Sequence, residues 1–431
     1  MESSISKDEE FDSQTLPMIT DTETPLPIGI IGAGISGIAL AISLQRKGLR
    51  SMIFEKDNGF HSRNQGYGLT LQQGGKAFKK LNLLDTVQSK CVLSNCHYIF
   101  NNKGELILGF GSFEPINNDS TWESKYICHI ARQDLRECFI DQLDPEYVTV
   151  HWESEFISYS EGISGVYINI KNKTDPFLVR CIAGCDGINS LVRQSLLPNL
   201  SLNFLNTFVM LGIVDSNTTF DHRVTQMSDG KTRIFCMPFN KKQMMWQLSF
   251  PIKTSFRLDK KELKELAIER CKFFHATLLN MLKDTVEDNI TGYPVYDRDP
   301  IQSADFPINV KVTLLGDAAH PMSPFKGQGA NQALLDAMYF TECLVKQLTV
   351  QDAIHEYQVQ MVKRTNSKVL GSREAVELLH TSEFVDTEYQ LRRMHYADLD
   401  EHLKMYKDIK DQNIGIWNIE RIDRYLKDRL G

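Results

Sequence analysis

The sequence has no excess of positive charge, no long apolar segment and few tryptophans. Its 431 residues carry 48 Lys and Arg against 55 Asp and Glu, a net charge of −7, whereas a nucleic-acid-binding protein has a basic footprint. No apolar run reaches the ~18 residues that a membrane span needs, so we expect no obligatory membrane anchor. The nine cysteines are odd in number and scattered. This pattern disfavours a disulfide scaffold and favours a reducing, cytoplasmic location.

Motifs of several other chemistries are also missing. There is no Gly-x-Ser-x-Gly, so a hydrolase has no support, and the scattered histidines predict no metal site. Cys91 and Cys96 lack the glycines and proline expected around a redox pair. Cys181 and Cys185 fall in and beside a predicted strand, which suits no zinc ribbon. We expect Cys91 and Cys96 to be buried and structural.

The chain is long enough for two or three packed units. Residues 1–27 are acidic and contain three prolines. They fit neither a secretory signal nor a mitochondrial presequence, and we expect a disordered tail. From residue 28 the apolar pattern predicts an α/β fold. Strands are expected at 28–31, 51–54, 92–112 (a hairpin), 147–158, 164–171, 177–184, 205–214, 232–239, 244–250 and 312–315, and helices at 35–47, 259–282, 327–347 and through most of 350–431.

The first motif follows a predicted strand and begins a predicted helix. Gly32, Gly34 and Gly37 fit G-x-G-x-x-G. In this pattern the first glycine allows a tight turn, the second lets a pyrophosphate approach the backbone, and the third packs the helix on the strand. Glu55 ends the next strand, 18 residues after Gly37, where its carboxylate can accept both ribose hydroxyls. The segment predicts a dinucleotide site but does not distinguish NAD from FAD.

Three further segments stand at characteristic distances from this loop. Residues 185–193 read Cys-Asp-Gly-Ile-Asn-Ser-Leu-Val-Arg after an apolar run. Residues 315–331 read Leu-Gly-Asp-Ala-Ala-His-Pro-Met-Ser-Pro-Phe-Lys-Gly-Gln-Gly-Ala-Asn between a predicted strand and a helix. Residues 132–135 read Arg-Gln-Asp-Leu at a helix start. Asp317 thus comes at the carboxyl end of a strand, where ligands bind in open α/β sheets.

In order and spacing, these motifs resemble the single-component flavin monooxygenases typified by para-hydroxybenzoate hydroxylase, and the tetracycline-inactivating monooxygenases are similar in the same places. The likeness covers roughly residues 28–365. It implies an α/β fold with a Rossmann-like FAD-binding domain, a mixed-sheet substrate domain and a C-terminal helical region. The expected boundaries are 28–90, 125–195 and 296–347 for the FAD-binding domain, 91–124 and 196–295 for the substrate domain, and 348–431 for the C-terminal helices.

The resemblance also implies an activity. NADPH or NADH would reduce FAD, and O2 would add to give a C4a-hydroperoxyflavin that hydroxylates a small aromatic or polycyclic substrate. The flavin performs the chemistry, so no catalytic side chain is obligatory. There is no second glycine loop, so the nicotinamide cofactor is expected to bind transiently, and we expect a monomer or homodimer. The alternatives are a flavin-dependent reductase of the geranylgeranyl-reductase type and a non-catalytic FAD module. Flavin halogenases are disfavoured because Trp-x-Trp is absent.

The same resemblance assigns roles to individual residues. Asp317 would bind a ribityl hydroxyl, and the helix N-terminus after Gln328 would face the negative edge of a reduced flavin. Pro324 has no N–H, so its carbonyl could face the ring without a competing donor. Pro324, Gly327, Gln328 and Gly329 would shape the flavin site. The expected FAD-binding residues are Gly32, Gly34, Gly37, Glu55, Arg63, Arg132, Asp186, Asp317, Gly329 and Ala330.

Three motif residues keep a second interpretation. Arg193 either reaches phosphate or is a paired or solvated surface group, and Arg63 lies in a polar loop whose alignment with the family is soft. His320 could be a general base, but a structural histidine hydrogen-bonded to the backbone is favoured.

The substrate side is predicted from two strands alone. By the period of two, Arg233, Phe235, Met237 and Phe239 share one face. On the partner strand Met245, Gln247 and Ser249 share one face, and Met244, Trp246, Leu248 and Phe250 share the other. One of these aromatic- and Met-rich faces should look onto the flavin and hold a planar, mostly apolar ligand.

Overall fold

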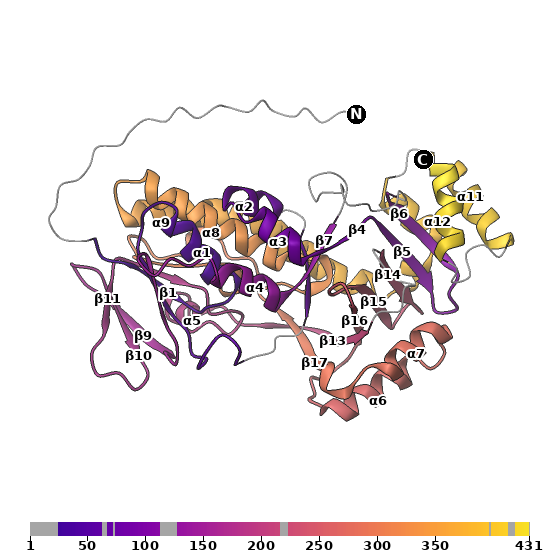
Figure 1. Ribbon diagram of the computed structural model, residues 1–431, viewed down its shortest axis with the longest axis horizontal. Coiled ribbons are helices and arrows are strands. Elements are labelled where there is room, and N and C mark those ends of the chain that lie inside the picture. Colours follow the sequence, from indigo (N-terminus) through magenta and orange to yellow (C-terminus); the bar gives the residue numbers. More distant parts are fainter. Residues whose placement is uncertain are drawn as a thin grey trace.

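The computed structural model describes residues 25–62, 67–71, 74–112, 127–215, 223–395, 398–412 and 419–430. These residues form four β-sheets and a set of helices (Figure 1). Of the expected tail, residues 1–24 lie outside the described part. The carbonyl of Pro25 accepts from Arg50 Nη2 at 2.8 Å, and that of Pro27 accepts from the Arg180 N–H at 2.8 Å. The chain is therefore held in place from Pro25 onward.

A five-stranded parallel sheet forms the centre of the first structural unit, in the order β18-β12-β1-β2-β8. Its short strands are almost entirely apolar, as is usual where both faces of a sheet are covered. Helices α1, α4 and α8 lie on one face, and a three-stranded antiparallel sheet of β9, β10 and β11 lies on the other together with α5. The elements are β1 (Ile28–Ile31), β2 (Ser51–Phe54), β8 (Val148–His151), β12 (Ile182–Gly184), β18 (Val312–Leu314), β9 (Phe156–Glu161), β10 (Val166–Ile170), β11 (Phe177–Val179), α1 (Ile35–Gln45), α4 (Arg132–Ile140), α5 (Leu191–Leu196) and α8 (Gly329–Lys346).

Neighbouring residues of β1 show how the two faces are packed. A Cβ placed on Gly29 would lie 2.7 Å from Ile168 Cδ1 of β10, so only glycine lets the second sheet approach this closely. Ile30 points to the opposite face, where its Cγ2 would lie 3.2 Å from a Cβ on Gly37 of α1. Both contacts belong to one hydrophobic core.

The second unit is a seven-stranded mixed sheet in the order β17-β13-β16-β15-β14-β5-β6. Its neighbours are antiparallel except for β14 and β5, which are parallel. One face packs on helices, and there the Trp246 ring is buried with its Nε1 donating to Thr285 Oγ1 at 2.9 Å. The elements are β5 (Cys96–Asn101), β6 (Leu106–Gly111), β13 (Asn203–Asp215), β14 (Arg223–Ser228), β15 (Arg233–Pro238), β16 (Gln243–Pro251), β17 (Ile290–Asp297), α6 (Lys260–Arg270) and α7 (Ala276–Asp284).

A small antiparallel sheet in the order β3-β7-β4 touches both units, since β3 contacts α8 and β7 contacts β15. Its strands are β3 (Gly68–Leu71), β4 (Val92–Ser94) and β7 (Ile127–Ala131), with α2 (Gly74–Lys80) and α3 (Leu84–Lys90) between the first two along the chain. Strand β4 belongs to the segment expected to open the substrate domain, yet it pairs with β7. The predicted division into domains stays a prediction.

The C-terminal helices join the two units. Along α9 (Val350–Leu378), the hydroxyl of Tyr357 donates to the Leu314 carbonyl at 3.1 Å, and Arg373 Nε donates to Asp297 Oδ2 at 2.7 Å. Helix α10 (Thr387–Arg393) follows, and α11 (Leu399–Asp411) and α12 (Ile419–Leu430) pack on the mixed sheet (Figure 1). Asp423 of α12 forms an ion pair with Arg223 and accepts from the Tyr98 hydroxyl. In the described residues, no helix has both the length and the apolarity to cross a membrane.

The predicted fold class is confirmed, and four local expectations are corrected. The strand expected at 147–158 is two strands, β8 and β9, and the strand expected at 177–184 is also two, β11 and β12; in both cases the two strands belong to different sheets. The helix expected at 259–282 is also two, because the chain turns between α6 and α7 at residues 271–275. Strands β3, β7, β14 and β17 were not expected. All nine cysteines are buried and free, and burial was expected for Cys91 and Cys96.

Candidate active site

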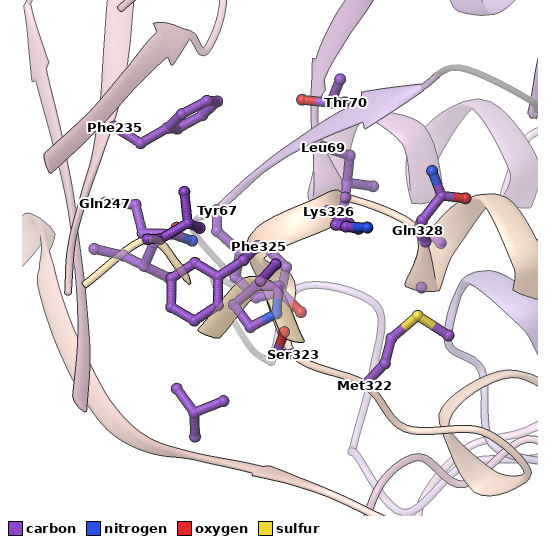
Figure 2. Close-up of a pocket in the computed structure, with 18 of the residues that line it drawn as sticks. Tyr67, Leu69, Thr70, Phe235, Gln247, Met322, Ser323, Phe325, Lys326 and Gln328 are labelled. Atoms are coloured by element: carbon purple, nitrogen blue, oxygen red, sulfur yellow. The ribbon is translucent and has the colours of Figure 1, made fainter. Parts of the chain in front are cut away.

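One cavity of about 1610 Å³ lies where the parallel-sheet unit meets the mixed sheet. Its walls bring together the glycine loop, the loops after β12 and β18, and one face of the mixed sheet. Figure 2 shows Phe235 and Gln247 reaching into the pocket from the strands, with Lys326 and Gln328 on the opposite side. The motifs that the sequence spreads over three hundred residues thus surround a single space.

The glycine loop has the close contacts that its sequence predicts. Gly32 has a φ of +103°, and a Cβ there would lie 2.7 Å from the Cys185 carbonyl oxygen. A Cβ on Gly37 would lie 2.0 Å from the Gly32 carbonyl oxygen, so α1 can approach the strand only with glycine there. Gly34 differs, because the nearest described atom to its Cβ, the Cys185 carbonyl oxygen, would be 4.0 Å away. Gly34 lines the cavity, and among the described residues no side chain caps α1 at this end, so its first N–H groups can bind a phosphate.

Glu55 is buried and holds the loop itself. Its Oε2 accepts from the Ala33 N–H at 2.7 Å, and its Oε1 accepts from the Asp57 N–H at 3.0 Å. Each carboxylate oxygen has a second lone pair, so these bonds do not use up its capacity to accept. Glu55 therefore orients the glycine loop, in addition to the ribose role that was predicted.

Asp186 caps the short helix α5. Its Oδ2 accepts from the N–H groups of Leu191 at 2.7 Å and Val192 at 3.2 Å, while Oδ1 is buried with no partner among the described residues. Burial raises the pKa of this carboxyl. The neighbouring residues Gly187, Ile188 and Asn189 line the cavity.

Arg193 is not the surface group that was one of its two interpretations. It is completely buried and makes no hydrogen bond to any carboxylate in the described part of the chain. Its Nη1 donates to the Ala318 carbonyl and its Nη2 to the Ile188 carbonyl, both at 3.2 Å. Arg193 therefore ties the loop after β12 to the turn after β18.

Asp317 is open to the cavity, and its carboxylate has no hydrogen-bond partner in the described residues. Desolvation by the surrounding protein raises its pKa, although the nearby charges of His320 and Arg132 act in the opposite direction. Gly329, the first residue of α8, lies beside it, since a Cβ there would be 3.5 Å from Asp317 Oδ1. No side chain caps α8 and its first turn holds no acidic residue. A free carboxylate and an open helix N-terminus thus face the same space.

The loop before α8 is a tight turn. Pro324–Lys326 form one 3-10 turn in which the Pro324 carbonyl accepts from the Gly327 N–H at 3.1 Å. One lone pair of this carbonyl is therefore used within the turn, which the sequence did not predict. Gly327 closes the turn in the left-handed conformation, with a φ of +59°. Gln328, Gly329 and Ala330 line the cavity beyond it.

His320 is a structural residue, but its partner is not the predicted backbone group. Its Nε2 lies 2.7 Å from Asp336 Oδ2, and both side chains are buried. Asp336 also accepts from the Gly316 N–H at 2.8 Å and forms an ion pair with Arg364 of α9. These positive neighbours lower the pKa of the Asp336 carboxyl despite its burial. Through Gly316 and His320, Asp336 thus holds the turn that contains Asp317.

Two predicted arginines have different outcomes. Arg132 begins α4, lines the cavity and lies with its guanidinium 5.3 Å from the centre of the Tyr67 ring. Arg63 falls outside the described residues. Arg136, which was not predicted, donates from Nη2 to the Ala33 carbonyl at 3.1 Å. It lies four residues after Arg132, and this helical spacing could have revealed it.

The mixed sheet presents one of its two predicted faces to the cavity. Arg233, Phe235 and Met237 of β15 line it with Met245 and Gln247 of β16, because Phe235 pairs with Gln247 and Met237 with Met245. The face that contains Trp246 packs on helices instead. Two further lining residues, His97 of β5 and Gln226 of β14, were missed. The pairing of β5 with β14 joins segments far apart in the chain, and no local sequence pattern predicts it.

The sequence and the fold are similar to those of known FAD-dependent proteins. A sequence model described as FAD binding domain matches residues 25–365. The chain is 27% identical over 354 residues to aurachin C monooxygenase/isomerase of Stigmatella aurantiaca, covering 81% of this chain and 88% of that protein. It is 26% identical over 391 residues to monooxygenase cfoF of Aspergillus candidus, covering 83% and 92%. HpxO of Klebsiella pneumoniae, solved with FAD and uric acid, has a TM-score of 0.74 at 19% identity, covering 90% of this chain and 97% of HpxO.

The residues of this chain fit the cofactor that the family binds. Gly34 borders the cavity with space around its Cα, the N-termini of α1 and α8 could receive anionic groups, and Asp317 offers an acceptor with no partner among the described residues. The chain therefore belongs to the FAD binding domain family and is an FAD-dependent monooxygenase.

Proposed function

We propose that this enzyme uses NADPH or NADH and O2 to hydroxylate a small aromatic or polycyclic substrate, held between the flavin and the mixed sheet. One observation carries the proposal: a single cavity joins the cofactor motifs to an apolar, aromatic sheet face. Such a wall with a few polar groups suits a planar ligand. HpxO, which has the same fold, was solved with FAD and the planar molecule uric acid.

The residue roles proposed for FAD follow the geometry. Gly34 and the N-terminus of α1 would receive the pyrophosphate, Glu55 the ribose, and Asp317 a ribityl hydroxyl. Gly327, Gln328, Gly329 and Ala330 would border the pyrimidine edge of the ring at the start of α8, where the helix dipole favours negative charge. Asp186 and Arg132 would act from the neighbouring loops, the latter near Asp317.

When bound, FAD would supply the redox chemistry by the C4a-hydroperoxyflavin route that the resemblance implies. The chain's own contribution is to orient the substrate and to exclude water. Met237, Met245, Phe235 and Phe325 give the cavity apolar walls, and no protein nucleophile is required. We also propose a cytoplasmic location, which is supported by nine free, buried cysteines.

The decisive experiment is a substrate screen with the FAD-loaded enzyme. NADPH and NADH consumption would be followed for a library of planar aromatic compounds, and products would be analysed by mass spectrometry. A product about 16 mass units heavier, formed only with O2 present, is expected from transfer of one oxygen atom. A reductase of the geranylgeranyl-reductase type would give a product two hydrogens heavier without O2, and the monooxygenase relatives do not favour it.

A further inference from the structure

A buried arginine lines the substrate side of the cavity. Arg233 of β15 is 2% exposed, and two glutamines fix its position. Its Nε donates to Gln226 Oε1 at 2.6 Å, and its Nη1 donates to Gln247 Oε1 at 3.3 Å. These amides come from the strands on either side of β15, so the mixed sheet holds the guanidinium in one orientation.

Gln226 is itself held in place by a second side chain, that of His97. Its Nε2 lies 2.5 Å from His97 Nε2, and because the amide nitrogen can only donate, His97 accepts at this atom. Burial and the Arg233 charge lower the pKa of His97 to about 3, so this imidazole is neutral at physiological pH. His97, Gln226 and Arg233 form a fixed chain whose last member is the cation.

No described carboxylate pairs with this cation. Arg233 forms neither an ion pair nor a hydrogen bond with Asp or Glu in the described ranges, and burial lowers its pKa to about 9. A guanidinium has five N–H donors, of which the two glutamines take two. The other three have no hydrogen-bond partner among the described residues. Burying a charge is costly unless it is paired, so a partner is expected from outside the chain.

The surroundings of Arg233 define what that partner can be. Its guanidinium carbon lies 5.2 Å from the centre of the Phe235 ring and 5.6 Å from that of Phe325, so aromatic faces border the charge. Two other buried histidines are His129, which lines the cavity, and His380, whose ring contacts Phe325. Burial lowers their pKa values to about 3 and about 4, so neither carries a charge at neutral pH. The charged residues that line the cavity are Arg132, Arg233, Arg257, Lys326 and Arg393 against Asp317 and Glu374. In a protein of net charge −7, this cavity is locally positive.

We propose that Arg233 binds an anionic oxygen group, a carboxylate in the simplest case, on a planar aromatic substrate. The guanidinium fork matches a carboxylate in geometry, and Phe235 and Phe325 contact the attached ring. This inference rests on the proposed function and narrows its substrate class from aromatic compounds to aromatic anions. Gln226 and Gln247 are positioning residues for Arg233.

Matched ligands test this proposal on the FAD-loaded enzyme. Benzoate, 2-naphthoate and 2-anthroate would each be compared with their carboxamides, which have the same shape without the charge. Binding would be measured from the perturbation of the flavin absorption spectrum. For at least one pair, the wild-type enzyme should bind the carboxylate about tenfold or more tightly than the amide, as expected for a charge-assisted bond.

The variants separate charge from shape. Arg233→Met should reduce the carboxylate-to-amide preference to about one, because carboxylate binding loses the charge-assisted bond and should fall further than amide binding. Arg233→Lys keeps the charge but not the fork, and should retain part of the preference. Arg233→Gln serves as a second neutral variant should the Met variant not fold, and each must first show wild-type FAD content.

Three results would overturn the proposal. One is a ligand panel in which no carboxylate binds better than its amide, including a panel in which nothing binds. Another is a preference that survives loss of the charge. The third is a shifted flavin reduction potential in Arg233→Met with unchanged ligand preference, which would mean that the cation serves the flavin. Failure of the proposed function would look different, because the anion preference would stand while no oxygenated product formed with any substrate.

Discussion

Arg193 donates to the carbonyl of Ala318, a residue 125 positions further along the chain, over 3.2 Å. Through Nη2 it also holds the Ile188 carbonyl, so one side chain connects the loop after β12 with the turn that presents Asp317. Burial and the neighbouring Arg298 lower its pKa to about 10, which leaves it charged at neutral pH. The relative position of these two loops therefore depends on the Arg193 guanidinium.

Arg193→Lys should therefore weaken both folding and FAD binding. A lysine keeps the charge but cannot reach both carbonyls in one plane. A buried carbonyl without its donor costs about 1–3 kcal/mol, to be measured by urea unfolding of the apoprotein and by FAD titration. Arg392→Lys is the control, because Arg392 is exposed and its side chain pairs with Glu388 one turn earlier, and its effect should stay within about 0.5 kcal/mol. Wild-type stability and FAD affinity in Arg193→Lys would show that the two loops keep their positions independently.

Asp317→Asn should act in opposite directions on the apoprotein and the holoenzyme. The raised pKa of Asp317 means that its ionised form is disfavoured in the folded apoprotein. The neutral amide should therefore raise the apoprotein's melting temperature at neutral pH. FAD should bind about 10- to 150-fold more weakly, because a charge-assisted hydrogen bond is worth about 1.5–3 kcal/mol.

The pH dependence checks the cause of that gain. Below the pKa that the Asp317 carboxyl has in the unfolded chain, it is protonated in both states and the wild type carries no penalty, so the difference between the two melting temperatures should vanish on acidification. It should return as the pH rises above that value and be complete above the raised pKa of the folded state. A gain that persists in acid would have to come from packing. Unchanged FAD affinity would remove Asp317 from the ribityl site.

Gly34 and Gly37 should respond differently to the same added methyl group. The methyl group of Gly34→Ala would lie 4.0 Å from the nearest described atom, the Cys185 carbonyl oxygen, so the apoprotein should melt as the wild type does. Its FAD affinity should fall about tenfold or more, since the methyl group occupies the path of the pyrophosphate. Gly37→Ala places a Cβ 2.0 Å from the Gly32 carbonyl oxygen and should destabilise the apoprotein itself, by about 1–3 kcal/mol or more. Wild-type FAD binding by Gly34→Ala would move the pyrophosphate away from this loop.

The parts of this molecule that local sequence determines were predicted well. The start of α1, the strands that frame the glycine loop and the start of α8 follow from glycine spacing and short apolar runs, and the structure places them within a residue or two. Strand alternation also separated the cavity face of β15 from the face that packs on helices. These features depend on neighbours only two to four residues away.

The contacts that hold the site were not predicted, because they join distant segments. Arg193 was expected near phosphate or at the surface, yet it binds two carbonyls, and His320 binds Asp336 instead of the backbone. The chain from His97 through Gln226 to Arg233 requires parallel pairing of β5 and β14, whose register one sequence does not reveal. Side-chain partners of this kind are fixed only when the sheets are assembled.

The N-terminus of α8 should tune the flavin electrostatically, and Gly329 is the position at which to test it. A Cβ there fits at ordinary contact distance, 3.5 Å from Asp317 Oδ1. Gly329→Asp adds a negative charge beside Asp317 and at the expected pyrimidine edge of the ring. Gly329→Asn adds almost the same volume without the charge and is the matched control. A charge at a helix N-terminus is worth about 0.3–1 kcal/mol when exposed and up to about 2 when partly buried.

The measured quantity is the two-electron reduction potential of the FAD-loaded variants. Reduction leaves negative charge at this edge, so the aspartate should make it harder. For a two-electron couple the energies above correspond to a potential roughly 10–40 mV lower in Gly329→Asp than in Gly329→Asn. Reduction by NADPH should be slower as well. Both variants must first be shown to retain FAD, because repulsion from Asp317 also weakens binding. Equal potentials in two fully loaded variants would mean that α8 does not point at the isoalloxazine, and the roles proposed for Gly327, Gln328 and Gly329 would have to be abandoned.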